Sequence, residues 1–176
     1  MADAPPRGFE DRLRDTRARL DGDIDLWLAT AGQDGPHLVP LSYLWDGATL
    51  LIATSRTSAT GRNLLADGRV RIALGATRDV VMVDGTAVPV DLADLTPGTG
   101  DAFAERTGFD PRELDGFQYF SVRPRRVQAW REVDEMPGRT LVRDGVWPDR
   151  AETGDIQTGD TQAGNVEAGD PALRSG

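Results

Sequence analysis

Hydroxyl and guanidinium side chains gather in one short stretch, residues 50–65 (LLIATSRTSATGRNLL). The stretch opens as an apolar strand and turns into the first residues of a helix at Arg62-Asn63-Leu64. A helix start leaves backbone N–H groups unpaired at the positive end of the helix dipole, so these groups together suit a phosphate. The alternative is that Ser58 or Thr57 only caps a short surface helix.

The composition limits the class of protein. With 176 residues, 39% of them hydrophobic and 28% charged, the chain suits one globular domain with a single core. It has no run of about 18 apolar residues, as a membrane span would need, and no apolar signal segment at the N-terminus. We therefore expect a cytoplasmic protein that makes no use of a membrane.

Charge and the rare residue types disfavour several kinds of site. The chain has no Cys and one His, so no metal site and no cysteine nucleophile are predicted. All 20 basic residues are Arg, which is typical of GC-rich codon usage and rules out Schiff-base catalysis by a lysine. The net charge of −9 argues against nucleic-acid binding.

The hydrophobic pattern predicts an N-terminal helix followed by short antiparallel strands. Residues 9–20 place apolar groups at helical spacing among charges, so we expect an amphipathic helix that ends near Gly22. Further short helices are expected before Asp67-Gly68 and at residues 101–107. The expected strands are residues 24–31, 37–45, 49–54, 70–75, 77–90, 117–132 and 138–147. This meander favours a small barrel over a parallel sheet.

Proline and glycine mark irregular positions in these strands. Pro40 has no N–H and must lie at a sheet edge or a bulge, which leaves nearby backbone groups free to face a ligand. Gly85 is expected at a bulge. Pro124 is expected to break the strand of residues 117–132, which then resumes at Val127.

Both ends of the chain lack the composition of a folded core. We expect residues 1–8 to be disordered, residues 9–150 to form the domain, and residues 151–176 to be a disordered acidic tail. In the tail, Gly followed by Asp or Asn recurs every five residues with few large apolar groups. A calcium-binding Gly-Asp repeat is the alternative, but such a repeat has an apolar inward position that this tail lacks.

The order of the landmarks resembles the pyridoxamine 5′-phosphate oxidase-like superfamily of flavin-binding split barrels, and within it the actinobacterial class that uses FMN or the deazaflavin coenzyme F420. The resemblance covers residues 26–147. It rests on Ala29-Thr30, residues 34–37, Val39-Pro40, Thr54, Arg62-Asn63-Leu64, Asp67, Arg69-Val70, residues 81–87, Phe120, Pro124, Val127 and Trp130. It implies a mainly β fold, a six-stranded antiparallel split barrel with an N-terminal helix, which forms a homodimer with the cofactor between the subunits.

The resemblance also implies roles for individual residues. The flavin or deazaflavin ring would face Pro40, Leu41 and Ser42. The phosphate would lie in a segment of hydroxyl, guanidinium and amide side chains: Thr54, Ser55, Arg56, Ser58, Thr60, Arg62 and Asn63. Many members carry Lys where this chain has Thr60. A hydrogen bond to a charged group contributes roughly 1.5–3 kcal/mol, so cofactor binding is expected to weaken about tenfold or more unless Arg56 or Arg62 compensates.

The implied chemistry is hydride transfer between the bound cofactor and a small conjugated or heteroaromatic substrate, with the reactivity supplied by the cofactor. No catalytic residue is assigned. Tyr43, Tyr119 and His37 are candidate proton donors, although such residues more often pack in a core or lie at a turn. Three tryptophans are expected in the core or in a dimer interface: Trp45, Trp130 and Trp147.

Two other functions stay open. One is a non-catalytic split-barrel module that binds or sequesters a flavin or another planar ligand. The other is a pyridoxamine 5′-phosphate oxidase in the strict sense, which would need further cations for the substrate phosphate and whose C-terminal part looks unlike that of this chain. Turnover with reduced cofactor distinguishes the oxidoreductase from the non-catalytic module.

Overall fold

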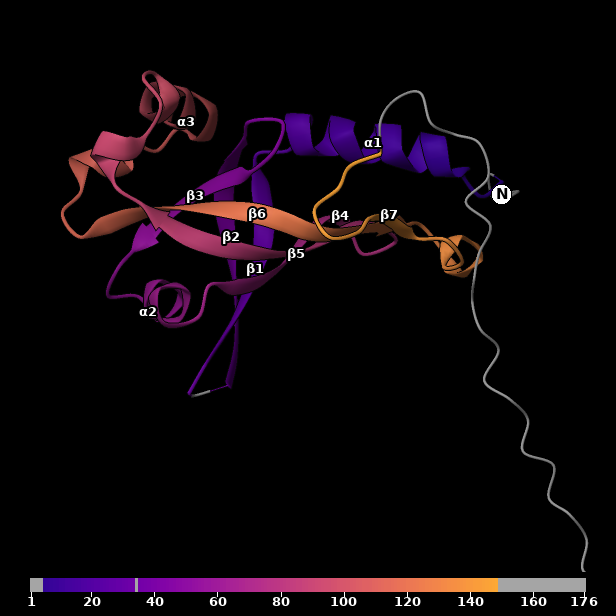
Figure 1. The fold of residues 1–176 in the computed structure, drawn as a ribbon, viewed down its shortest axis with the longest axis horizontal. Helices are drawn as coiled ribbons and strands as arrows, with labels where there is room; N and C mark the ends of the chain where they lie inside the picture. Colours follow the sequence, from indigo (N-terminus) through magenta and orange to yellow (C-terminus); the bar gives the residue numbers. More distant parts are fainter. Residues whose placement is uncertain (1–4, 34, 149–176) are drawn as a thin grey trace, which may run out of the picture.

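Antiparallel strands dominate the structure, and three helices surround them (Figure 1). The computed structural model describes residues 5–33 and 35–148. Its helices are α1 (Phe9–Gly22), α2 (Ala59–Ala66) and α3 (Thr99–Thr107), with 3-10 turns η1 (Leu92–Asp94), η2 (Pro111–Glu113) and η3 (Val133–Glu135). Its strands are β1 (Asp25–Gly32), β2 (Gly35–Trp45), β3 (Leu50–Ser55), β4 (Arg69–Ala76), β5 (Asp79–Val90), β6 (Phe117–Trp130) and β7 (Thr140–Val142).

Six of the strands close into a barrel. Their order is β3-β2-β1-β4-β5-β6, and β3 pairs again with β6 to complete the ring, while β7 adds to the outer edge of β6. Every pairing is antiparallel. The predicted six-stranded antiparallel barrel with an N-terminal helix is therefore confirmed.

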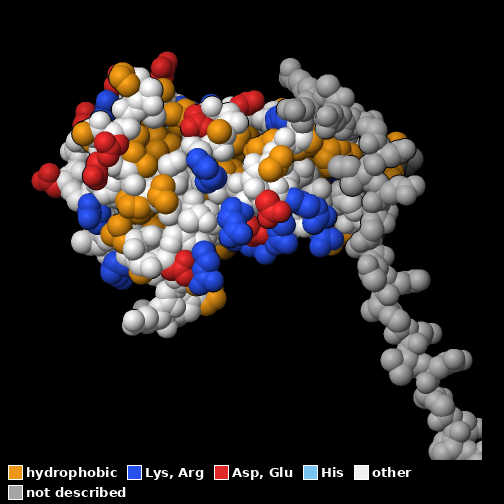
Figure 2. Space-filling model, in the orientation of Figure 1, with side chains coloured by type: hydrophobic (Ala, Val, Ile, Leu, Met, Phe, Trp, Pro, Cys, Tyr) orange, Lys and Arg blue, Asp and Glu red, His pale blue; other side chains and the backbone are white. Residues whose placement is uncertain are grey.

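The barrel interior is filled by the alternate residues that the sequence marks as apolar. Ile52, Ile72 and Phe120 are fully buried there. Helix α1 packs Leu13 and Leu20 onto the barrel and contacts β6 and β7, whereas α2 lies on the other side of the barrel against β1, β2, β3 and β5 (Figure 1). Arg12 and Glu135 are the charged side chains that are buried among the described residues. Figure 2 shows cationic and acidic groups intermingled on the face in view.

The effect of a proline or glycine within a strand depends on how many neighbouring strands pair with that strand at the same position. Pro40 lies at a sheet edge, as predicted, because β3 pairs only with the last residues of β2. On the other side, the register between β2 and β1 is continuous through Pro40, so β2 has no bulge there. The bulge at Gly85 is confirmed by a register shift between β5 and β6. The predicted break at Pro124 is wrong. This proline lies opposite Gly85 in a part of β6 that pairs only with β5, so the strand continues without its N–H.

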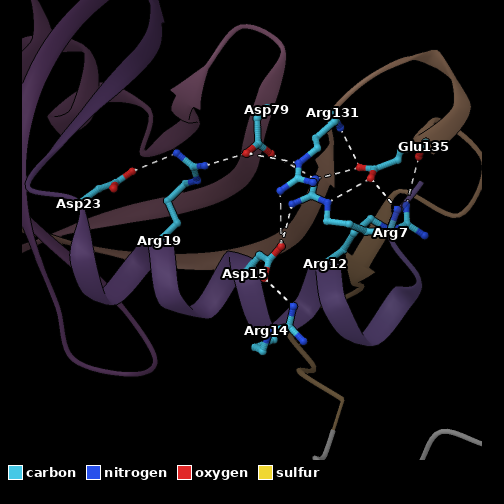
Figure 3. A network of polar contacts seen from close by, with 9 residues as sticks. All are labelled: Arg7, Arg12, Arg14, Asp15, Arg19, Asp23, Asp79, Arg131 and Glu135. Atoms are coloured by element: carbon cyan, nitrogen blue, oxygen red, sulfur yellow. Dashed lines mark hydrogen bonds and ion pairs between the residues drawn. The ribbon is translucent and has the colours of Figure 1, made fainter. Parts of the chain in front are cut away.

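A network of ion pairs ties the N-terminal segment to the far end of the barrel (Figure 3). Arg7 donates to Glu135 through its backbone N–H and its guanidinium, both at 2.8 Å, and it also contacts Asp15 and Asp79 at 3.1 Å. Glu135 is 3% exposed and also accepts a hydrogen bond from the backbone N–H of Arg131. Arg7 falls within the segment expected to be disordered, residues 1–8, of which the structure describes residues 5–8. The tail expected at residues 151–176 lies outside the described residues.

None of the described helices is both long enough and apolar enough to cross a membrane.

Candidate functional site

The candidate site is the junction of β3 and α2. Thr54 and Ser55 end β3, and Ser58 is the N-cap of α2. The Ser58 hydroxyl accepts a hydrogen bond from the Gly61 N–H at 2.9 Å and donates to the Ser55 carbonyl at 2.8 Å, and it lies 3.2 Å from the Thr54 hydroxyl. Ser58 therefore caps the helix. The next two N–H groups, of Ala59 and Thr60, have no acceptor among the described residues, so they remain available to an anion.

Close packing holds this junction rigidly against the barrel. A Cβ atom at Gly61 would lie 2.1 Å from the Ser55 carbonyl oxygen, so only glycine allows the first turn of α2 to approach β3 this closely. On the same helix, Asn63 donates to the Thr30 hydroxyl of β1 at 3.1 Å. Helix start and strand end are thus fixed relative to each other before any ligand binds.

Two arginines flank the junction, and each donates a hydrogen bond to a neutral group. Arg56 donates to the Gln118 side-chain oxygen on β6 at 2.7 Å, and Arg62 folds back onto the carbonyl of Thr57. Among the residues that the structure describes, neither arginine forms an ion pair. The junction therefore carries two positive charges that no local carboxylate neutralises.

Strand β2 is the neighbour of β3 in the barrel. The two strands pair only from Tyr43–Ile52 to Trp45–Leu50, so the pairing ends before it reaches Thr54 on β3. Helix α2 contacts both strands. The Ser42 hydroxyl donates a hydrogen bond to the Asp25 carboxylate at 2.6 Å. The residues predicted to face the ring, Pro40, Leu41 and Ser42, thus lie on the strand next to the one that ends at the junction.

Thr60 is 3% exposed and is packed within the first turn of α2. The position where related chains are expected to carry Lys is therefore a buried one. A longer side chain there would have to extend outward along the helix before its head group reached solvent.

The candidate proton donors differ in their surroundings. Tyr43 is fully buried and its hydroxyl donates to the Leu20 carbonyl at 3.1 Å, and burial raises the pKa of this tyrosine. Tyr119 is 5% exposed, and its hydroxyl is buried without a hydrogen-bond partner within the described ranges. His37 is half-buried on β2. Tyr43 is thus a core residue, as is typical of its type.

Trp45 packs on Trp147 with ring centroids 6.0 Å apart.

Two of the cavities formed by the described residues lie away from the centre of the junction. The larger, of about 400 Å³, lies at the Gly85 bulge beside a group of arginines, and none of its lining residues is a predicted site residue. The smaller, of about 270 Å³, includes Arg56.

Sequence reasoning missed the partners that orient the predicted residues. Gln118 positions Arg56, and Thr30 positions Asn63. Both partners come from strands that meet the junction only through closure of the barrel, so no local pattern in the sequence points to them.

The part of the chain that contains the junction is similar to one known protein family. The model of the family described as "Pyridoxamine 5'-phosphate oxidase" matches residues 16–131. No curated protein matches the chain. Among solved structures, a putative pyridoxamine 5′-phosphate oxidase from Listeria innocua is similar, with 16% identity and a TM-score of 0.57, and the alignment covers 71% of this chain and all (100%) of that one.

Two further neighbours differ in what they bind. An FAD-binding protein from Mesorhizobium loti has 21% identity and a TM-score of 0.51, with 65% of this chain and 88% of that chain covered. The heme storage protein HutZ from Vibrio cholerae has 15% identity and a TM-score of 0.51, with 66% and 92% covered. At these identities the likeness shows a shared fold.

Proposed function

Because the chain belongs to the pyridoxamine 5′-phosphate oxidase family, we propose that it is a cytoplasmic oxidoreductase that transfers a hydride between a bound FMN or deazaflavin coenzyme F420 and a small conjugated or heteroaromatic substrate. The observation that carries the proposal is the β3–α2 junction. It combines unpaired N–H groups, hydroxyls and two unneutralised arginines within a few residues of one another.

The residues of the junction fit the phosphate of such a cofactor. The N–H groups of Ala59 and Thr60 would donate to it, together with the hydroxyl of Ser55, and Arg62 is exposed and within the same turn. The strand edge at residues 40–42 would support the ring. When bound, the flavin or deazaflavin supplies the hydride chemistry, and the chain supplies orientation and charge. Thr60 in place of Lys leaves the arginines and the backbone as the donors.

We further propose that the protein forms a homodimer through the outer face of the barrel. Trp27 on β1 and Leu38 on β2 are 50% and 60% exposed. In the strand register, Trp27 lies beside Pro40 and Ala73, and Ala73 lies beside Met82, so apolar side chains form a row across four strands. A row of this kind is typical of an interface. Trp27→Glu is expected to give a monomer by light scattering, and an unchanged molar mass would refute this interface.

The second candidate is a non-catalytic module that binds a flavin or another planar ligand. The burial of the Tyr43 and Tyr119 hydroxyls favours it, since neither is exposed to serve as a proton donor. Turnover with reduced cofactor and a panel of conjugated substrates separates the two functions. Tight binding without turnover would favour the module.

Titration of the protein with FMN and, separately, with coenzyme F420 tests the site itself. Ligand at about 100 times Kd should stabilise the fold by roughly 2.7 kcal/mol in a thermal-shift assay. Arg62→Ala is expected to weaken binding about tenfold with no change in fold. Arg14→Ala, an exposed arginine of α1, is the matched control. Unchanged affinity in Arg62→Ala would refute the placement of the phosphate.

A further inference from the structure

The larger cavity, of about 400 Å³, lies at the surface of the barrel where β4, β5 and β6 meet the turn after β7, and we call it the bulge cavity. Its volume is within the range typical of small-molecule sites. Four arginines and two aspartates give its lining a net charge of +2, although the whole chain carries −9. These charged lining residues are Arg69, Asp84, Arg125, Arg126, Arg143 and Asp144.

An irregularity in the pairing of β5 with β6 shapes this cavity. Asp84 on β5 pairs with Arg126. The next residue of β5, Gly85, pairs with Pro124, so Arg125 is an extra residue of β6 without a partner on β5. Side chains of a regular strand alternate between the two faces of a sheet, whereas Arg125 and Arg126 are consecutive and both exposed. The bulge therefore turns two neighbouring guanidinium groups outward into one cavity.

The turn after β7 is fixed against this bulge. The Gly145 N–H donates to the Arg125 carbonyl at 2.8 Å. Asp144 and Gly145 have φ angles of 53° and 77°, as a two-residue hairpin turn requires, and Arg143 pairs with Val146 across them. Because Arg143 directly precedes this turn, the bond to the bulge brings Arg143 to the cavity that Arg125 lines.

Two of the four arginines are held by carboxylates. Arg126 donates from Nε to Asp84 at 2.7 Å, and Arg69 donates from Nε to Asp67 at 2.8 Å. In both arginines the bonds use Nε and Nη2, and Nη1 has no partner within the described part of the chain. A guanidinium group has five N–H donors, so Arg69 and Arg126 are positioned by their carboxylates and keep donors for a ligand.

The other two arginines, Arg125 and Arg143, carry unpaired charges. Their side chains form no hydrogen bond or ion pair with the residues that the structure describes. Asp144 also lacks an ion pair there, and its charge is included in the net charge of +2. Figure 2 shows cationic side chains gathered around acidic ones near β5 and β7 on the face in view. A ligand with two or more negative charges would neutralise this lining.

We propose that the bulge cavity binds a diphosphate group, either free or as part of a nucleotide. Its two phosphates pair with the guanidinium groups of Arg125 and Arg143, which come from the bulge and from the turn after β7. Near neutral pH a diphosphate carries two or more negative charges, which offset the lining. Orthophosphate or a single carboxylate would leave one of these two arginines unpaired. The cavity shares no lining residue with the β3–α2 junction, so the site does not depend on the proposed hydride transfer.

Calorimetric titration of the full chain, without flavin or deazaflavin, with inorganic pyrophosphate tests the class of ligand. Orthophosphate, which has one phosphate group, is expected to bind about tenfold or more weakly. ADP distinguishes the two sources of the diphosphate: tighter binding than that of pyrophosphate assigns a nucleotide, and equal or weaker binding assigns the free anion. Absence of pyrophosphate binding, or equal binding of orthophosphate, would overturn the proposal.

Variants locate the binding. Arg125→Gln and Arg143→Gln are each expected to weaken pyrophosphate binding about tenfold with no change in fold, since each removes one exposed and unpaired guanidinium group. Arg14→Gln, an exposed arginine of α1 outside the cavity, is the matched control for the loss of one charge. Arg62→Ala, at the β3–α2 junction, is expected to bind pyrophosphate like the parent.

If the two cavity variants bind like Arg14→Gln, or if only Arg62→Ala loses binding, pyrophosphate is bound elsewhere and the assignment is wrong. The proposed cofactor site is tested separately, by titration with FMN and coenzyme F420. Failure of one proposal is therefore distinguishable from failure of the other.

Discussion

Replacement of Glu135 by Gln is expected to destabilise the fold by about 3 kcal/mol at neutral pH. The pKa of Glu135 is lowered to about 2. The largest cause is the hydrogen bond from the Arg7 side chain, and the backbone N–H groups of Arg7 and Arg131 and the charge of Arg7 act in the same direction. Together they outweigh burial, which raises the pKa. A glutamate with an ordinary pKa of 4.5 that falls to about 2 on folding stabilises the native state by about 3 kcal/mol where it is ionised in both states. Glu135 is 3% exposed, so solvent screens this contribution little.

The sign of the pH dependence follows from the lowered pKa. The contribution is complete above the unfolded pKa, near 4.5, and it is lost as the pH falls toward about 2, where the folded carboxylate takes up its proton. The difference in unfolding free energy between the parent and Glu135→Gln is therefore expected to shrink to less than half at pH 3.

Urea unfolding at pH 7 and pH 3 measures this difference directly. Glu132→Gln is the matched control, because Glu132 pairs with Arg78 but its side chain is 45% exposed, and exposed pairs contribute about 0–1 kcal/mol. A Glu135→Gln protein as stable as the control at pH 7 would refute the reasoning. So would a destabilisation that is equally large at both pH values.

Two further substitutions probe the candidate site. Gly61→Ala forces a Cβ atom to within 2.1 Å of the Ser55 carbonyl, so it is expected to destabilise the fold by about 1–3 kcal/mol and weaken cofactor binding, as seen by urea unfolding and titration. Gly22→Ala, which meets nothing within 4 Å, should be neutral or slightly stabilising, and equal behaviour of the two variants would contradict the packing argument. Asn63→Ala removes the bond to Thr30 and is expected to cost about 1 kcal/mol in the same unfolding assay, whereas no loss would mean that this bond does not hold α2.

Much of the fold was predictable because its signals are local. The place of Ser58 before an apolar helical segment predicts a helix cap, and Ser58 caps α2. The place of Gly85 within a strand predicts a bulge, and the register shift lies beside it. Alternation of apolar residues predicted the strands. Pro124 misled the prediction, since the effect of a proline depends on which neighbours its strand has, and those neighbours are distant in sequence.

The family resemblance located the candidate site on the sequence, but its side-chain partners depend on closure of the barrel. Pairing of β3 with β6 brings Gln118 to Arg56, which are 62 residues apart. The bond from Arg7 to Glu135 joins residues 128 positions apart.

The sequence by itself therefore determined the elements, the barrel class and the position of the strand-to-helix junction, because caps, turns and alternation are encoded within a few neighbouring residues. Only the tertiary structure decided which charges are paired, which are left open to a ligand, and where the cavities lie. These features arise from contacts between distant segments, whose register is set by the whole barrel.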